Sequence, residues 1–223
     1  MVDLLEHWLG VVRSVARGSG PWLAFNAVLA TIPAVLAVGL FHRPRARTPL
    51  WWAGVAAFVV FLPNAPYVIT DLIHLRGMID ANPGSPGSGL VPAGALAALV
   101  LWGLGSYAVC LAQLDRVLRR GRGAPHRSLI RGCVHVACGF GVVLGRVPRL
   151  HSWHLVTRPR DTVDGIVSLF HPLAAPLILA LAVAFALGAA ALTAVARAAT
   201  ERTVELATAA RGLIAGRAGG ARA

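Results

Sequence analysis

The run "LWWAGVAAFVVFLPNAPYVI" at residues 50–69 decides the fold class, because it is apolar for long enough to cross a membrane as a helix. A bilayer core of about 30 Å requires roughly 20 apolar residues at a rise of about 1.5 Å per residue. Four further segments reach a similar length, at residues 21–41, 90–113, 129–147 and 172–196. None of them alternates polar and apolar residues as a membrane-barrel strand does. The sequence therefore predicts an all-α fold, a polytopic transmembrane helical bundle with five spans.

The composition agrees with a membrane protein. Of the 223 residues, 57% are hydrophobic and only 13% are charged, whereas a soluble domain carries about 25% charged residues. The formal net charge of +12 could indicate nucleic acid as a partner, but the arginines stand in short clusters between apolar runs, as topology signals do. We therefore expect the lipid bilayer as the partner, with anionic lipid headgroups as a second candidate and no nucleic acid. The sequence identifies no cofactor.

The two ends of the chain differ from the apolar middle. In residues 1–20, apolar side chains recur at helical spacing with charged side chains opposite them, which predicts an amphipathic helix lying on the membrane surface. A frayed chain end is the alternative, and a sixth span is the second choice for the span count. Residues 21–197 form the predicted transmembrane domain. Residues 198–223 form a tail rich in Arg, Ala and Gly that we expect to be cytoplasmic and partly disordered.

The arginines also predict an orientation in the cell (inner or plasma) membrane. With five spans and the amino terminus outside, the cytoplasmic side holds fourteen arginines and the other side seven. Arginine is enriched on the cytoplasmic side, so we expect the amino terminus outside and the carboxyl terminus inside. The second and fourth spans run in the same direction, so polar residues after both should lie at the same membrane face.

Two prolines interrupt the second span. Pro63 and Pro66 each lack an amide hydrogen and crowd the preceding turn, which frees backbone carbonyls that must find partners in lipid. Asn64 stands between them and is suited to donate to such a carbonyl. We therefore predict that the second span is kinked or broken at Pro63 and Pro66. The alternative is that the span stops at Leu62 and a turn follows.

Asp71 and His74 follow this break. Thr70 is expected to cap a new helix beginning at Asp71, and residues three apart share a helix face. A carboxylate on that face can orient the imidazole as an acid–base pair, or both groups can bind a metal. A capping aspartate beside a histidine at headgroup level is the plainer alternative. The catalytic residues, if there are any, are unknown, and Asp71 and His74 are the candidates.

The end of the fourth span, "LGRVPRLHSWHL" at residues 144–155, supplies a second polar group. Arg146 and Arg149 can bind lipid phosphate or pair with Asp71, although arginines also extend to the membrane surface without any specific partner. No metal site is predicted, although one could combine four side chains of ordinary ligand chemistry, namely Asp71, His74, His151 and His154. The candidate binding residues are Asn64, Arg146, Arg149 and Ser152.

These motifs resemble the signature segments of a bacterial and archaeal membrane family, domain-of-unknown-function family 1361. The resemblance is carried by "FLPNAPYVITDLIHL" (61–75) and "GVVLGRVPRLHSWHL" (141–155), with support from "FNAVLATIPAVLAV" (25–38) and "GLGSYAVCLAQ" (103–113), and it covers about residues 22–195. The family's second motif usually reads L-G-R, then an arginine, then Asn-Ser-Trp-Asp. His151 and His154 replace that Asn and Asp here, so a metal site that needs both histidines would not be a family feature. The resemblance implies no activity.

Three classes of function remain open at this point. A structural or accessory membrane protein would use Asp71 and Arg146 as a clamp between helices, and this is the function we expect. A membrane-embedded enzyme acting on lipid or envelope phosphate substrates would use Asp71 and His74 for proton transfer. A small-solute transporter would need polar groups through the depth of the membrane, and the spans offer few, mainly Asn26, Ser106 and His135.

Overall fold

The described part of the chain is all-helical. The structure, a computed structural model, describes residues 2–43, 46–81, 88–120, 124–146, 157–168 and 172–220, and none of these residues lies in a strand. Five helical stretches are long and apolar enough to cross a membrane, namely Gly20–Phe41, Pro49–Asp80, Leu90–Arg119, Arg127–Arg146 and Ala174–Thr203. The predicted fold class and the five predicted spans are confirmed, and these helices indicate a membrane protein.

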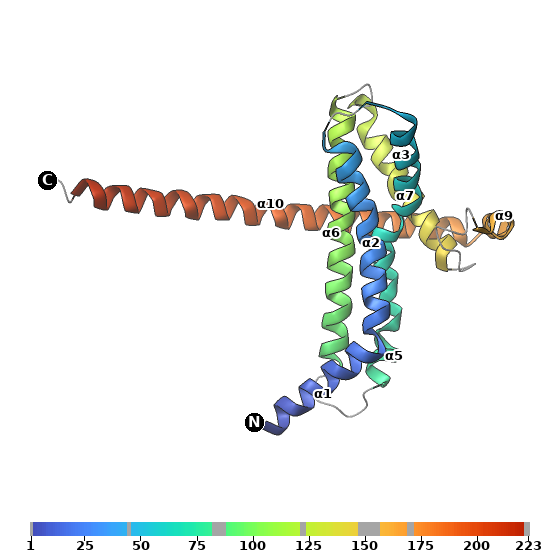
Figure 1. Cartoon of the computed structure of the whole chain (residues 1–223), viewed down its shortest axis with the longest axis horizontal. Helices are drawn as coiled ribbons and strands as arrows, with labels where there is room; N and C mark the ends of the chain where they lie inside the picture. Colours follow the sequence, from blue (N-terminus) through green and yellow to red (C-terminus); the bar gives the residue numbers. More distant parts are fainter. Residues whose placement is uncertain are drawn as a thin grey trace.

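The element order follows the predicted spans. The helices are α1 (Val2–Gly18), α2 (Gly20–Phe41), α3 (Pro49–Phe61), α4 (Asn64–Tyr67), η1 (Val68–His74), α5 (Leu75–Asp80), α6 (Leu90–Arg120), η2 (Ala124–His126), α7 (Arg127–Arg146), α9 (Pro159–Ser168) and α10 (Ala174–Gly220). In Figure 1, α2 runs alongside α6 through the middle of the molecule, with α3 beside α2. Trp102 of α6 donates its indole N–H to the Thr31 hydroxyl of α2 at 2.9 Å, which ties the central pair.

The second span is broken where the prolines predict. The helix α3 ends at Phe61, and the chain then continues as the short α4, the 3₁₀ helix η1 and α5. Asn64 donates its side-chain amide to the Phe61 carbonyl at 3.0 Å, so a carbonyl beside the break has a partner. The span therefore does not stop at Leu62. Helical structure extends past the predicted end at residue 69, to Asp80.

Glycines allow the broken segment to lie deep between its neighbours. A Cβ atom on Gly103 of α6 would lie 2.4 Å from the Ala65 carbonyl oxygen, and one on Gly141 of α7 would lie 2.6 Å from Cγ of Pro63. Both distances are far below a normal contact, so each position requires a residue without a side chain. The small residues bring α4 close to α6 and α7, as small residues do at helix contacts in membranes.

The last long helix is oriented differently from the others. In Figure 1, α10 crosses α6 and α7 steeply instead of running alongside them. The crossing with α7 is close, because a Cβ atom on Gly139 would lie 2.5 Å from the Ile178 carbonyl oxygen. Large apolar side chains of α10 stay exposed in the structure, among them Leu179, Val183 and Leu187. In a membrane protein such surfaces are covered by lipid.

The two ends of the chain are helical in the structure. Val11 and Val15 of α1 pack against Met78 and Leu96, so residues 2–18 are a docked helix and not a frayed end. Its position on a membrane surface stays a prediction. The helix α10 continues through Gly220, and the expected partial disorder of residues 198–223 stays a prediction. The division of the chain into three parts and the cytoplasmic placement of the tail also stay predictions.

Candidate functional site

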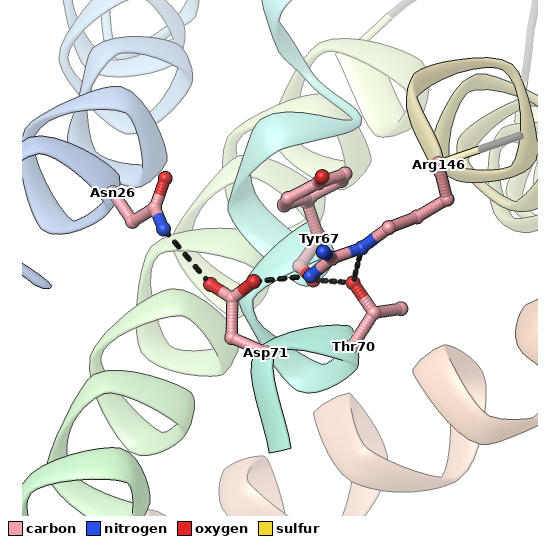
Figure 2. A network of polar contacts seen from close by, with 5 residues as sticks. All are labelled: Asn26, Tyr67, Thr70, Asp71 and Arg146. Atoms are coloured by element: carbon pink, nitrogen blue, oxygen red, sulfur yellow. Dashed lines mark hydrogen bonds and ion pairs between the residues drawn. The ribbon is translucent and has the colours of Figure 1, made fainter. Parts of the chain in front are cut away.

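Asp71 is the centre of a polar network inside the helix bundle. Asp71 is only 1% exposed. Asn26 of α2 donates its side-chain amide to Oδ2 of Asp71 at 3.0 Å, and Arg146 from the last turn of α7 forms an ion pair with Oδ1 through Nη2. Figure 2 shows the carboxylate between these two side chains. Three separate elements, α2, η1 and α7, are therefore joined through one carboxylate.

Arg146 is held by the broken segment at more than one point. Its Nε donates to the Thr70 hydroxyl at 2.8 Å, and its guanidinium carbon lies 4.5 Å from the centroid of the Tyr67 ring, in a cation–π arrangement. The Thr70 hydroxyl in turn donates to the Tyr67 carbonyl at 2.7 Å. Residues three apart in a 3₁₀ helix lie above one another. Thr70 follows Tyr67 by three residues, and Asp71 is the next residue; Arg146 contacts all three (Figure 2).

The polar network lies at a depth within the length of the first span and not at the end of that span. Asn26 is six residues after Gly20, where α2 begins, which places it about 9 Å along the helix axis at 1.5 Å per residue. A charged carboxylate at this depth is costly unless it is paired and hydrogen-bonded. Arg146 and Asn26 supply that pairing, and the Arg146 side chain itself is 25% exposed.

A cleft of about 620 Å³ begins at the network and extends between α3 and α7. Its polar lining is gathered at the end next to η1, where it includes Asn26, Asn64, Tyr67, Asp71, Arg146 and, from α9, Thr162. The opposite end is lined by apolar residues such as Phe41, Phe58 and Val134. The cleft is thus polar at one end and apolar along its length. We call it the α3–α7 cleft.

A family model described as "Protein of unknown function (DUF1361)" matches residues 25–189, which include Asn26, Asp71 and Arg146. The chain belongs to the DUF1361 family. The resemblance of the two polar motifs to this family is thereby confirmed. A search of curated proteins and a search of solved structures each found no match. The comparisons therefore assign this DUF1361 chain to a family without giving it an activity.

Of the predicted site residues of this DUF1361 chain, Asp71 and Arg146 are in direct contact. Asn64 lines the same cleft, but its amide is bonded to the Phe61 carbonyl. The His74 side chain is exposed and packs edge-on against Trp22, with the ring centroids 5.0 Å apart. No hydrogen bond joins His74 to Asp71. Their arrangement is therefore not that of an acid–base pair.

The other predicted site residues lie in residues 147–156, outside the part of the chain that the structure describes. These are Arg149, His151, Ser152 and His154. Their roles in binding or as metal ligands stay predictions. Among the described residues, no group of three or more His, Cys, Asp or Glu side chains is arranged to hold a metal ion.

Three residues of the network were not among the predicted site residues, namely Asn26, Tyr67 and Thr70. Asn26 carried a usable signal, because a polar side chain inside an apolar span faces other helices. Thr70 was expected to cap a helix beginning at Asp71, and this is wrong. The 3₁₀ helix already begins at Val68, and the Thr70 hydroxyl donates to the Tyr67 carbonyl instead of capping. The contacts of Tyr67 and Thr70 with Arg146 become visible only in the three-dimensional path of the broken segment.

Proposed function

We propose that this DUF1361 protein is a structural or accessory protein of the bacterial cell envelope, and that the network of Asn26, Asp71 and Arg146 clamps its helices together. The observation that carries the proposal is that both oxygens of Asp71 are occupied, one by α2 and the other by α7. A buried carboxylate with two partners on separate helices holds those helices in one arrangement.

The geometry favours this function over an enzyme. A general base must lie within hydrogen-bond reach of the substrate proton that it accepts. The oxygens of Asp71 are both engaged within the protein, and His74 is not bonded to it. Neither candidate catalytic residue is therefore prepared for proton transfer in the described part of the chain.

The geometry also favours this function over a transporter. Two pairs of polar groups in the described spans bond to each other: the Tyr107 hydroxyl lies 2.7 Å from Nδ1 of His135, and Asn26 is bonded to Asp71. Pairs of this kind connect helices, whereas a solute path needs polar groups that face a continuous opening. This supports a structural role for the polar residues in the spans.

The arginine distribution supports a cell (inner or plasma) membrane location with the amino terminus outside and the carboxyl terminus in the cytoplasm. In that orientation the Asp71 network faces the outer side. The ion pair between Asp115 and Arg131, at 3.1 Å, and the contact of Arg116 with His42, at 2.6 Å, lie toward the cytoplasmic side. A cysteine substituted for Ser88 or for Arg43, labelled from outside intact cells, tests the orientation. Only the cysteine at position 88 should react, because the proposed orientation places it outside.

A charge swap tests the clamp. We expect Asp71→Arg and Arg146→Asp each to lower the melting temperature of the purified protein in detergent, and we expect the double variant to recover part of the loss. Partial recovery is expected because the Asn26 amide can either donate or accept, so it can bond to an arginine at position 71, whereas Thr70 and Tyr67 were arranged for an arginine at position 146. If the double variant loses as much as the two single variants together, the clamp is wrong.

The same proposal is tested against the enzyme alternative in cells. Envelope lipids of a deletion strain are compared after complementation with wild type or with Asp71→Asn. If Asp71→Asn changes the lipid profile but not the melting temperature, the structural clamp is wrong and the enzyme is the better function. A lowered melting temperature at normal lipid turnover supports the clamp.

A further inference from the structure

The α3–α7 cleft has the length of a lipid chain. Its lining on α7 extends from Ile130 to Arg146, sixteen residues further along the chain, which is about 24 Å at 1.5 Å per residue. One leaflet of the hydrocarbon core is about 15 Å thick, half of about 30 Å. The cleft is therefore long enough to hold an extended hydrocarbon chain, and its volume of about 620 Å³ falls in the usual range for bound ligands, about 300–1,000 Å³.

The walls of the cleft suit a hydrocarbon and not water. The α3 wall includes Val55, Phe58 and Val59, and the α7 wall includes Val134 and Ala137. Val59 is 59% exposed within the protein. A buried water needs two to four polar partners, and a space with apolar walls does not supply them. Within a membrane these walls face hydrocarbon, and an apolar chain that fills the cleft gains close packing contacts with them.

The polar end of the cleft offers hydrogen-bond donors. Asp71 is buried, and each of its oxygens already accepts a bond from the protein. Arg146 uses Nε and Nη2 for its contacts, and within the described residues its Nη1 and the Tyr67 hydroxyl have no hydrogen-bond partner. Both residues line the cleft. An arginine N–H and a tyrosine O–H are donors that match the oxygens of a phosphate.

We propose that the α3–α7 cleft binds one hydrocarbon chain of a membrane phospholipid, with the lipid phosphate on Nη1 of Arg146 and the Tyr67 hydroxyl. The charge of Arg146 and the apolar walls argue for this one occupant, because a free anion would use only the polar end and a neutral oil only the walls. The clamp described above needs no ligand, so this lipid site goes beyond it.

A plugging variant tests the chain-binding part. Ala137 lines the cleft and is exposed, so a tryptophan there fills the cleft without replacing a packed core residue. Val136, its exposed neighbour on α7, does not line the cleft and gives a matched control. The probe is phosphatidylglycerol added to the full chain purified in dodecyl maltoside, with bound lipid counted by native mass spectrometry.

We expect Ala137→Trp to weaken phosphatidylglycerol binding by roughly tenfold or more, because the tryptophan occupies the cleft and the lipid chain loses its packing contacts there, while Val136→Trp binds as wild type does. Equal binding by the two variants overturns the proposal. A change of oligomeric state in Ala137→Trp without loss of lipid also overturns it, because the cleft would then be covered by a second copy of the chain.

The headgroup part is tested with three probes, namely phosphatidylglycerol, a diacylglycerol with the same chains, and inorganic phosphate. We expect phosphatidylglycerol to bind more tightly than diacylglycerol, and Tyr67→Phe to reduce that preference about threefold to tenfold, the effect of one hydrogen bond. Tyr67→Phe keeps the ring under Arg146. Stabilisation by inorganic phosphate alone would overturn the lipid in favour of a free anion, and equal binding of diacylglycerol would overturn the phosphate contact.

These outcomes are separate from the clamp. If Asp71→Asn leaves stability unchanged, the clamp fails, while the comparison of Ala137→Trp with Val136→Trp still decides the lipid site. If the lipid site fails, the charge-swap result still decides the clamp.

Discussion

Two aspartates of the second span, Asp71 and Asp80, each pair with an arginine, and the two pairs differ in almost every physical respect. Asp80 and Arg76 are an i,i+4 pair with 3.8 Å between charged atoms, and their side chains are 68% and 92% exposed. Asp71 and Arg146 come from segments 75 residues apart, and their side chains are 1% and 25% exposed. Water screens the first pair, and the protein surrounds the second. The same two residue types therefore serve as a solvated helix face in one place and as a connection between helices in the other.

The largest expected effect is at the buried pair. Asp71→Asn removes the charge opposite Arg146 and leaves that arginine largely inside the bundle, so we expect a loss of about 3 kcal/mol in the free energy of unfolding. Thermal or denaturant unfolding in detergent measures this loss. A loss below about 0.5 kcal/mol, the size seen for exposed pairs, would show that the two pairs do not differ as their burial implies.

A smaller effect is expected at the neutral partner of Asp71. Asn26→Leu removes the amide that donates to Oδ2 while keeping a side chain of similar size, and Arg146 still pairs with Oδ1. Hydrogen bonds between membrane helices contribute about 0.6 kcal/mol on average and at most about 1.7, so we expect a loss of about 1 kcal/mol. Unfolding of Asn26→Leu, Asp71→Asn and the double variant gives the coupling between the two sites. Strictly additive losses would contradict a shared network.

The smallest effect is expected at the exposed pair. Asp80→Asn removes one charge from the Arg76 pair, and exposed i,i+4 pairs on a helix contribute about 0.3–0.5 kcal/mol. We expect a melting temperature close to that of wild type, which makes this variant the control for Asp71→Asn. A loss at Asp80 that matches the loss at Asp71 would remove the basis of the comparison.

The difference between the two pairs also marks how far the sequence could predict the site. The pair of Arg76 and Asp80 can be read from spacing alone. The contact of Asp71 with Arg146 could be anticipated only as one of two alternatives, through the argument that the second and fourth spans end at the same face. Asn26 comes from the first span, and nothing in the spacing of the chain connects it to Asp71.

The fold shows the same division. Long apolar runs predict five spans, and two prolines predict the break, because each effect acts within one segment. The steep crossing of α10 depends on contacts such as Gly139 with the Ile178 carbonyl, between residues of different helices. The sequence shows that such glycines suit close packing, but not which helix approaches each one or at what inclination.

The seven-residue 3₁₀ helix from Val68 to His74 also fixes the direction in which each of its side chains leaves the helix axis. Each residue in such a helix turns the next by about 120°, against about 100° in an α-helix. A residue inserted before Asp71 would rotate its carboxylate by about a third of a turn, away from Arg146, with no change in composition or hydropathy. The length of this short segment therefore carries structural information that substitution at any single position leaves untouched.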